Sequence, residues 1–371
     1  MKIRDALLLS LMAGVLHAPA TYARTFRVPT DAPTIQEALD AASARDTVIV
    51  GYGTFTGPGN WNLTFRGRDL YLTSAGGPEF TILDGTEGQP EGARGLYFSS
   101  ESWVAVVEGF TIQNFNAHYE GSGILVAGTA QPTVLGCVFR GNTVANTTPQ
   151  GPQGAAIQVR DTAKPLFESC YVGENGGWDH DGSIVNVDDT AVLRMTDCFI
   201  AHNLGHDACI VRVGRHARAE LLRCAVLGNI PCGIHAESTL QMEACLLVGN
   251  GSPHGGGARM KSGTARRCTF AQNWGYGGGL EVLADGDVTA ERSIFHGNCG
   301  DLGSQILLRG ALRLSCCAVA DSGIWLGPGG SVEWTGPQVS EDPQFCRPGD
   351  CAEYQDDDDY SLRTDSPCRP Q

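Results

Sequence analysis

The sequence predicts an all-β protein that folds as a right-handed parallel β-helix of about eleven coils, with a short capping α-helix at its N-terminus. Three observations lead there. A Cys-x-x-x-x-Asn phrase returns every 21 to 33 residues, a glycine-rich cluster ending in an aliphatic residue alternates with it, and the intervals between the two are too short for helices. Repeats of this length are typical of stacked architectures, in which each unit buries its apolar face against its neighbours.

The Cys-x-x-x-x-Asn phrase occurs in six intact copies, and a seventh copy has Ser293 in place of the cysteine. We expect the repeated cysteine to point inward as a small apolar filler and to stay reduced, because stacked side chains with parallel directions bridge poorly. We expect the repeated asparagine to stack at a turn and to hydrogen-bond along the axis. The six copies are Cys137–Asn142, Cys170–Asn175, Cys198–Asn203, Cys224–Asn229, Cys245–Asn250 and Cys268–Asn273.

The glycine-rich half of the repeat predicts short strands separated by turns. Clusters such as Gly121–Ile124 and Gly277–Leu280 end in an aliphatic residue, and the next cysteine or its equivalent follows 10 to 14 residues later. Runs such as Gly279–Leu283 alternate apolar and polar residues, which indicates strands with one buried face. Three strands per coil, stacked about 4.8 Å apart, would make a rod on the order of 50 Å long.

Residues 1–23 have the pattern of a secretory signal peptide. Lys2 and Arg4 precede the apolar run Leu7–Leu16, and small residues offer cleavage after Ala20 or Ala23. We therefore expect export to the periplasm, the cell surface or the medium. No later apolar run approaches the length of a membrane helix, so membrane insertion is not expected.

The mature chain reads as one elongated domain in three parts. Residues 24–50 predict an N-terminal cap, because Thr34–Glu37 has the spacing of a capping box and is followed by the β-branched run Asp46–Val50. Such a helix would cover the open end of the stack. Residues 51–325 hold the coils, and residues 326–371 form an irregular C-terminal cap.

The cap and the coils together resemble the pectate-lyase-like family of secreted bacterial right-handed β-helix repeat proteins. The resemblance covers nearly all of residues 25–368 and implies the fold, but this fold hosts lyases, polygalacturonases, epimerases and phage tailspikes. The calcium-binding aspartates of the lyases and the paired-Asp, Gly-His-Gly and Arg-x-Lys signatures of polygalacturonases are missing. The segments that carry the resemblance are Phe26–Asp40, Gly109–Asn114, Asp342–Phe345, Tyr360–Leu362 and Ser366–Cys368.

Charge and cysteine content restrict the partners. The formal net charge of −15 argues against nucleic acid and anionic membranes. The sequence has no Cys-x-x-Cys pair that would indicate a metal site. The acidic run Asp356–Asp359 could recruit calcium, but it lacks the spacing of an EF-hand. We therefore expect no metal site and no cofactor. In the C-terminal cap we expect at least one disulfide, either Cys351–Cys368 or Cys346–Cys351.

One candidate site gathers polar residues from neighbouring coils at a single rim. Carboxylates beside imidazoles could act as general acid and base on a sugar, or hold a divalent metal; equally, His and Asp are ordinary residues of polar turns. Nearby aromatic side chains could stack on a sugar ring. The predicted catalytic residues are Asp179, His180, Asp181, His206 and Asp207, and Trp178, His254, Trp274 and Tyr276 are predicted to bind substrate.

A second candidate site is an outward row on the strand that follows each aliphatic anchor. Arg212, His235 and Arg259 are its basic members and are predicted to bind substrate; Gln158, Asn186 and Glu281 complete it. Pectate-lyase-like enzymes use a groove along such a face, so the resemblance implies a binding surface here.

Three functional hypotheses follow. The favoured one is a non-catalytic exported module that binds a polysaccharide or a cell-surface glycan. The alternatives are a polysaccharide-degrading enzyme, lyase or glycoside hydrolase, that uses the rim patch, and a purely structural or adhesive rod. Exposure of Trp178, Trp274 and Tyr276 would favour binding, and burial of all three would favour the rod.

Overall fold

The computed structural model describes residues 23–86, 92–117, 120–144, 154–176, 182–205, 209–251, 256–300, 302–320, 323–336, 338–339, 342–347, 359–363 and 366. Residues 1–22 of the predicted signal peptide, Cys351, Cys368 and Asp356 to Asp358 lie outside this set, and so do the side chains of Cys346 and Asp359. The signal peptide, the C-terminal disulfide and the role of the acidic run therefore stay predictions.

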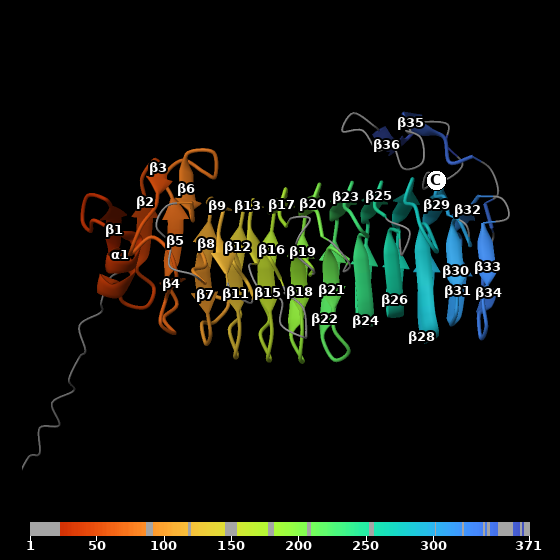
Figure 1. The fold of residues 1–371 in the computed structure, drawn as a ribbon, viewed down its shortest axis with the longest axis horizontal. Coiled ribbons are helices and arrows are strands. Elements are labelled where there is room, and N and C mark those ends of the chain that lie inside the picture. Colours follow the sequence, from red (N-terminus) through yellow and green to blue (C-terminus); the bar gives the residue numbers. More distant parts are fainter. Residues whose placement is uncertain are drawn as a thin grey trace, which may run out of the picture.

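The described chain is a rod of stacked parallel strands (Figure 1). Each coil contributes a strand to each of three rows, which we call face 1, face 2 and face 3 in the order in which the chain passes through them after a glycine cluster. The coils of faces 1 and 2 merge into one 21-stranded sheet, and face 3 is an 11-stranded sheet. The predicted β-helix of about eleven coils is confirmed.

Faces 1 and 2 merge because three long strands run through both: β24 (Ile234–Glu243), β26 (Ala258–Arg266) and β28 (Leu280–Glu291). The other strands of face 1 are β4 (Leu63–Thr64), β7 (Leu96–Phe98), β11 (Ile124–Val126), β15 (Ile157–Val159), β18 (Val185–Val187), β21 (Val211–Val213), β30 (Ile306–Leu308) and β33 (Ile324–Leu326). Those of face 2 are β1 (Thr25–Val28), β2 (Thr47–Val50), β5 (Tyr71–Ser74), β8 (Val106–Glu108), β12 (Thr133–Leu135), β16 (Leu166–Glu168), β19 (Val192–Thr196), β22 (Arg218–Leu222), β31 (Ala311–Ser315) and β34 (Ser331–Trp334).

Face 3 follows the repeated cysteine, and two small pairs lie beside the main sheets. The strands of face 3 are β3 (Gly53–Phe55), β6 (Thr81–Asp84), β9 (Thr111–Gln113), β13 (Val138–Arg140), β17 (Tyr171–Gly173), β20 (Phe199–Ala201), β23 (Ala225–Leu227), β25 (Leu246–Val248), β27 (Thr269–Ala271), β29 (Ile294–His296) and β32 (Ala318–Val319). The small pairs are β10 (Asn116–Ala117) with β14 (Thr143–Val144), and β35 (Phe345–Arg347) with β36 (Asp359–Leu362).

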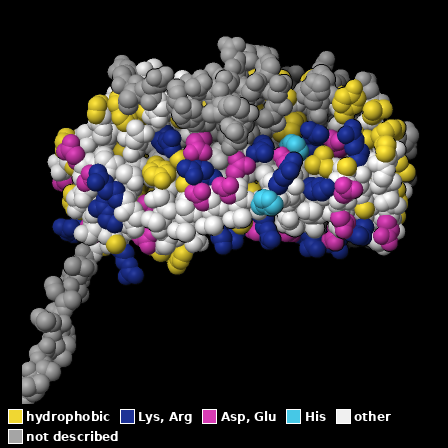
Figure 2. Space-filling view, turned by 60° about the horizontal axis from the view of Figure 1, so that its bottom comes forward, with side chains coloured by type: hydrophobic (Ala, Val, Ile, Leu, Met, Phe, Trp, Pro, Cys, Tyr) yellow, Lys and Arg dark blue, Asp and Glu magenta, His cyan; other side chains and the backbone are white. Residues whose placement is uncertain are grey.

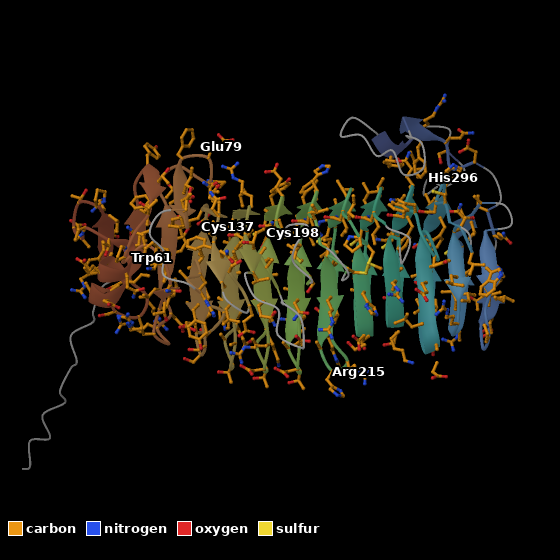
Figure 3. The ribbon with its side chains drawn as sticks, viewed as in Figure 1. Trp61, Glu79, Cys137, Cys198, Arg215 and His296 are labelled. Atoms are coloured by element: carbon orange, nitrogen blue, oxygen red, sulfur yellow. A yellow bond between two sulfur atoms is a disulfide. The ribbon has the colours of Figure 1, made fainter. Side chains whose placement is uncertain are left out.

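The N-terminal end of the rod carries a short helix, and at the other end the stacked strands continue to β34, within the segment 326–371 that was predicted to be irregular. Helix α1 (Ile35–Ala41) begins at Thr34, whose side chain accepts a hydrogen bond from Glu37 N at 3.3 Å, and it buries Ile35 and Leu39 against the first coils. At the other end, the β35–β36 pair lies over face 3, where the Phe345 ring sits 5.9 Å from the His296 ring (Figure 3).

The asparagine ladder forms as predicted and is buried. Asn229 is fully buried, and its Nδ2 donates to Asn250 Oδ1 at 2.9 Å and to Ile200 O at 2.8 Å. Its Oδ1 accepts from the backbone N and the Nδ2 of Asn203 at 3.1 and 3.0 Å. Each rung therefore satisfies its own amide and the turn of the preceding coil.

The cysteine ladder is reduced, as predicted, and Figure 3 shows two of its members, Cys137 and Cys198, where coils enter face 3. The interpretation of the cysteine as an apolar filler was incomplete. The Cys224 thiol lies 3.5 Å from Leu222 O and 3.4 Å from Met195 O, and the Ser293 hydroxyl makes the equivalent bonds to Glu291 O at 3.1 Å and Ala265 O at 3.0 Å. The position therefore holds a small donor that bonds two backbone carbonyls, of which Leu222 O also accepts from Asp197 N at 3.0 Å.

A disulfide that the sequence analysis did not predict joins Cys209 to Cys232. The two Cα atoms are 4.6 Å apart, and the residues precede face 1 in adjacent coils. The bond therefore clamps the two coils that present Arg212 and His235.

The asparagine ladder gives the first prediction. Asn229→Leu removes four buried hydrogen bonds, so we expect the free energy of unfolding to fall by at least about 1–3 kcal/mol in chemical denaturation. Asn116→Leu is the control, because Asn116 is exposed. Equal stability of Asn229→Leu and the wild type would contradict a stabilising ladder.

The cysteine ladder gives the second. Cys224→Ser keeps a donor of similar size and should retain more stability than Cys224→Ala, which loses both side-chain hydrogen bonds, leaves a small cavity and should cost about 1–3 kcal/mol. Thermal denaturation of both variants measures the order. If alanine were better tolerated than serine, the thiol would act only as a filler.

Candidate functional site

The predicted rim patch cannot be placed. Its members fall in two segments between faces 3 and 1 that lie outside the described residues: Asp179, His180, Asp181, His206 and Asp207, as well as Trp178. His254 also lies outside them. An acid–base role for this patch stays a prediction.

The predicted outward row of face 1 exists. Direct pairing of successive strands sets Gln158, Asn186, Arg212, His235, Arg259 and Glu281 in one line along the rod. The structure therefore brings together all three basic residues that the sequence assigned to this row. Figure 2 shows cationic and anionic side chains interspersed along one side of the rod.

Arg212 is the centre of a polar network in this row. Its Nη1 lies 2.8 Å from Asp188 Oδ1, and its Nη2 lies 3.2 Å from Glu237 Oε1. Asn186 connects the network to the next coil by donating to Gln158 Oε1 at 3.0 Å. Arg215, at the lower edge of the rod in Figure 3, pairs with Glu237 at 3.0 Å. Arg212 is thus held in place by two carboxylates.

Arg259 and Glu281 form a second, more buried pair two coils further on. Arg259 Nε lies 2.6 Å from Glu281 Oε2, and Arg309 Nε lies 3.6 Å from Oε1 of the same carboxylate, whose side chain is only 2% exposed. A carboxylate this deep requires cationic partners. These arginines therefore have a structural task in addition to any ligand contact.

His235 lies between the two arginine networks and is partly buried. Burial lowers its pKa to about 4; the charges of Arg259 and Arg212 act in the same direction, and Glu237 opposes them. The imidazole is consequently neutral at pH 7, and none of the described residues forms a hydrogen bond with it.

Trp274 and Tyr276 occupy the turn between faces 3 and 1. The backbone of Trp274 bridges to Gly251 and Cys299 in the adjacent coils, and its side chain is partly buried. Tyr276 is 40% exposed. Of the three aromatic residues meant to separate a binding module from a rod, one is therefore open to solvent and one is partly so.

A groove on the outer surface of face 2 was not predicted. It encloses about 620 Å³ and crosses the strands from β16 to β28. Its outward lining side chains include Leu166, Arg194, Thr196, Glu220, Gln241, Glu243, Thr264, Arg266 and Glu291. A hollow of this volume lies in the range of ligand-binding clefts.

The carboxylates of this groove all have arginine partners. Arg194 Nε lies 3.0 Å from Glu220 Oε2, and Arg266 Nη2 lies 3.0 Å from Glu291 Oε2. Glu243 lies 3.5 Å from Arg267, just outside the groove. Gln241 and Thr264 are hydrogen-bonded to each other on the adjacent coils between these pairs. The surface thus offers many donors and acceptors with little net charge.

The sequence pattern indicates that the polar residues of the groove point outward. In Leu193-Arg194-Met195 and Leu240-Gln241-Met242, a polar residue stands between two apolar ones, which places it on the outer side of a strand. The hollow itself depends on how neighbouring coils are offset, and no single repeat encodes that offset.

Neither a metal centre nor a membrane span is found in the described part of the chain. No three His, Cys, Asp or Glu side chains of the described residues come together in a way that could hold a metal ion. None of the helices described is long and apolar enough to cross a membrane.

His235 gives the third prediction. A folded-state pKa of about 4, below the ordinary 6.5, means that the folded protein resists protonation there. Stability from this group is therefore present above pH 6.5 and is lost as pH falls towards 4, by up to roughly 3 kcal/mol. NMR titration of the imidazole measures the pKa.

His235→Gln should lose less stability between pH 6.5 and pH 4 than the wild type does, whereas His216→Gln, an exposed control, should match the wild type. A His235 midpoint near 6.5 would contradict the prediction.

Comparison with known proteins supports the β-helical fold of the central coils. A family model described as "Right handed beta helix region" matches residues 92–251. No curated protein matches the sequence.

Several solved structures are similar in fold. Pectate lyase Pel9A is 14% identical, with 93% of this chain and 90% of that chain covered and a TM-score of 0.45. An alginate lyase from Paenibacillus sp. str. FPU-7 is 12% identical, with 85% and 99% covered and a TM-score of 0.37. Endopolygalacturonase I from Stereum purpureum, complexed with two galacturonate, is 14% identical, with 82% and 98% covered and a TM-score of 0.38. Residues 92–251 match the model of the right-handed β-helix region, and the flanking coils continue the same stacking, so the described chain is a right-handed parallel β-helix.

Proposed function

We propose that this chain is an exported, non-catalytic module that binds a polysaccharide or a cell-surface glycan in the face-2 groove. The observation that carries the proposal is an open groove of about 620 Å³ that crosses several coils and in which the carboxylates are paired with arginines. Export rests on the signal-peptide pattern of residues 1–23.

The shape and chemistry of the groove suit an extended chain of sugars. The coils repeat along the rod, so successive sugars would meet similar donors and acceptors. Arg194, Glu220, Gln241 and Thr264 present guanidinium, carboxylate, amide and hydroxyl groups, which between them can both donate to and accept from sugar hydroxyls. The opposite charges nearly balance, which favours a neutral glycan for a chain of net charge −15.

Glycoside hydrolysis would make other demands on the groove. It uses a carboxylic acid that gives a proton to the leaving oxygen and a second carboxylate beside it. Glu220 and Glu291 already accept hydrogen bonds from Arg194 and Arg266, so neither stands free beside a ligand. Binding is the function that these contacts support.

An enzymatic role remains the second candidate, and His235 favours it. A neutral imidazole between Arg212 and Arg259 has a lone pair available to remove a proton from a sugar whose acidic group the arginines neutralise. This lyase reaction would release unsaturated fragments. The predicted rim patch, which could instead serve hydrolysis, lies outside the described residues, and a structural rod would neither retain nor cleave a glycan.

The fourth prediction tests binding with matched double variants. Removing the groove pair in Arg194→Ala/Glu220→Ala should weaken retention of a bound polysaccharide at least about tenfold. Arg313→Ala/Glu333→Ala removes a pair on the same face outside the groove and should leave retention unchanged. Affinity electrophoresis against neutral and acidic polysaccharides measures both.

The product assay separates the three functions. Absence of retention by the wild type on every polysaccharide would overturn the binding function. Ultraviolet-absorbing unsaturated fragments that disappear in His235→Gln would establish the lyase instead. Equal retention by the two double variants would move the binding site away from the groove.

A further inference from the structure

A second hollow lies on face 1 near the N-terminal cap. It encloses about 430 Å³, and its lining includes Thr64, Arg94, Tyr97, Glu120, Leu125 and Arg160. These residues come from the coils of β4, β7, β11 and β15, on a different face from the groove described above, and only the coil of β15 and β16 contributes to both. Nothing in the proposed function assigns it a role.

Arg94 is the unusual residue of this hollow. The described residues hold five partly buried arginines, and the other four, Arg68, Arg160, Arg212 and Arg259, each donate to a carbonyl or a carboxylate. The guanidinium of Arg94 makes no hydrogen bond or ion pair with any described residue; only its backbone N is bonded, to Asn62 Oδ1 at 3.0 Å.

Burial without a partner is costly for a guanidinium. Burial lowers the pKa of Arg94, and the Glu120 charge opposes this without forming a contact. A guanidinium that loses water normally gains an acceptor in exchange. Its fork of donors is therefore available to an anion that enters the hollow.

The neighbouring charges leave the hollow cationic. Arg160 Nε lies 3.2 Å from Glu120 Oε1 and so occupies that carboxylate, while Arg160 Nη1 lies 3.3 Å from Asp161. Arg94 and Arg160 against Glu120 give the lining a net charge of +1. This is a positive site on a chain whose net charge is −15.

The floor of the hollow is apolar and aromatic. Thr64, Tyr97 and Leu125 follow one another on adjacent strands of face 1. Leu125 is 2% exposed, whereas Tyr97 is partly exposed. A tyrosine beside a hydroxyl-bearing residue suits the body of a small ring with polar substituents, such as a sugar.

We propose that this hollow binds one oxyanion, a carboxylate, sulfate or phosphate group, carried on a sugar or a sugar-sized polar ring. Arg94 receives the oxyanion, Tyr97 packs against the ring, and Arg160 with Glu120 forms the opposite wall. The site is separate from the face-2 groove, and it holds whether or not a polysaccharide binds there.

The test uses one sugar with different anions. Binding of glucuronate, glucose 6-sulfate, glucose 6-phosphate and uncharged glucose to the full chain is measured by calorimetry at low salt. We expect at least one anionic sugar to bind with a millimolar or lower Kd and glucose not to bind. The anion preferred among the three identifies the source of the oxyanion.

Two variants tie the binding to Arg94. Arg94→Met should weaken the binding at least about tenfold, and Arg218→Met, which changes an exposed arginine on face 2, should alter it less than about twofold. If Arg94→Met does not fold by circular dichroism, Arg94→Lys, which keeps the charge and loses the fork, should bind at least about threefold more weakly than the wild type.

The proposal is overturned if none of the three anionic sugars binds at millimolar concentration, if glucose binds equally well, or if the Arg94 variant that folds keeps wild-type affinity. Retention of polysaccharide in the face-2 groove is measured separately with the Arg194/Glu220 variants, so the two proposals can fail independently.

Discussion

Register between coils depends on the buried asparagine ladder. The side-chain amide of Asn203, for example, bonds Asn229 of the next coil and accepts from Asn175 N in the turn of the preceding coil. A shift of one residue would leave these groups unpaired in an apolar interior and would turn every outward side chain inward. The ladder at one corner therefore determines which residues meet on all three faces.

The cysteine position does the same work at a second corner. Where the chain turns from face 2 into face 3, a thiol or hydroxyl donates to backbone carbonyls of its own and the preceding coil, as Cys224 and Ser293 both show. Burial raises the pKa of the Cys137 thiol, so this thiol stays protonated and keeps its hydrogen to donate. A reduced cysteine is suited to this corner, because disulfides between neighbours would remove the donors.

The repeat made the architecture predictable, and it also set the limit of what could be predicted about function. Arg212, His235 and Arg259 could be placed in one row because they follow an aliphatic anchor by the same spacing. The groove around Gln241 could not, since a hollow depends on the offset between coils. The Cys209–Cys232 bond was missed because it lies outside the repeated cysteine position. The rim patch falls in segments of variable length, where the repeat gives no register.

Whether an arginine has a carboxylate partner distinguishes arginines that stabilise the stack from arginines that can bind a ligand. The residue type alone does not make this distinction. Arg212 and Arg259 lie in the predicted binding row, yet each is occupied by carboxylates that the neighbouring coils provide. Such an arginine can be explained by the stability of the stack alone. Arg94 cannot be explained in this way, because it is partly buried on an acidic protein that has carboxylates in excess, and none of the carboxylates that the structure describes contacts its guanidinium. Selection for a stable fold alone would favour an acceptor beside the Arg94 guanidinium. Its unpaired N–H donors are better explained by a ligand that supplies the acceptor.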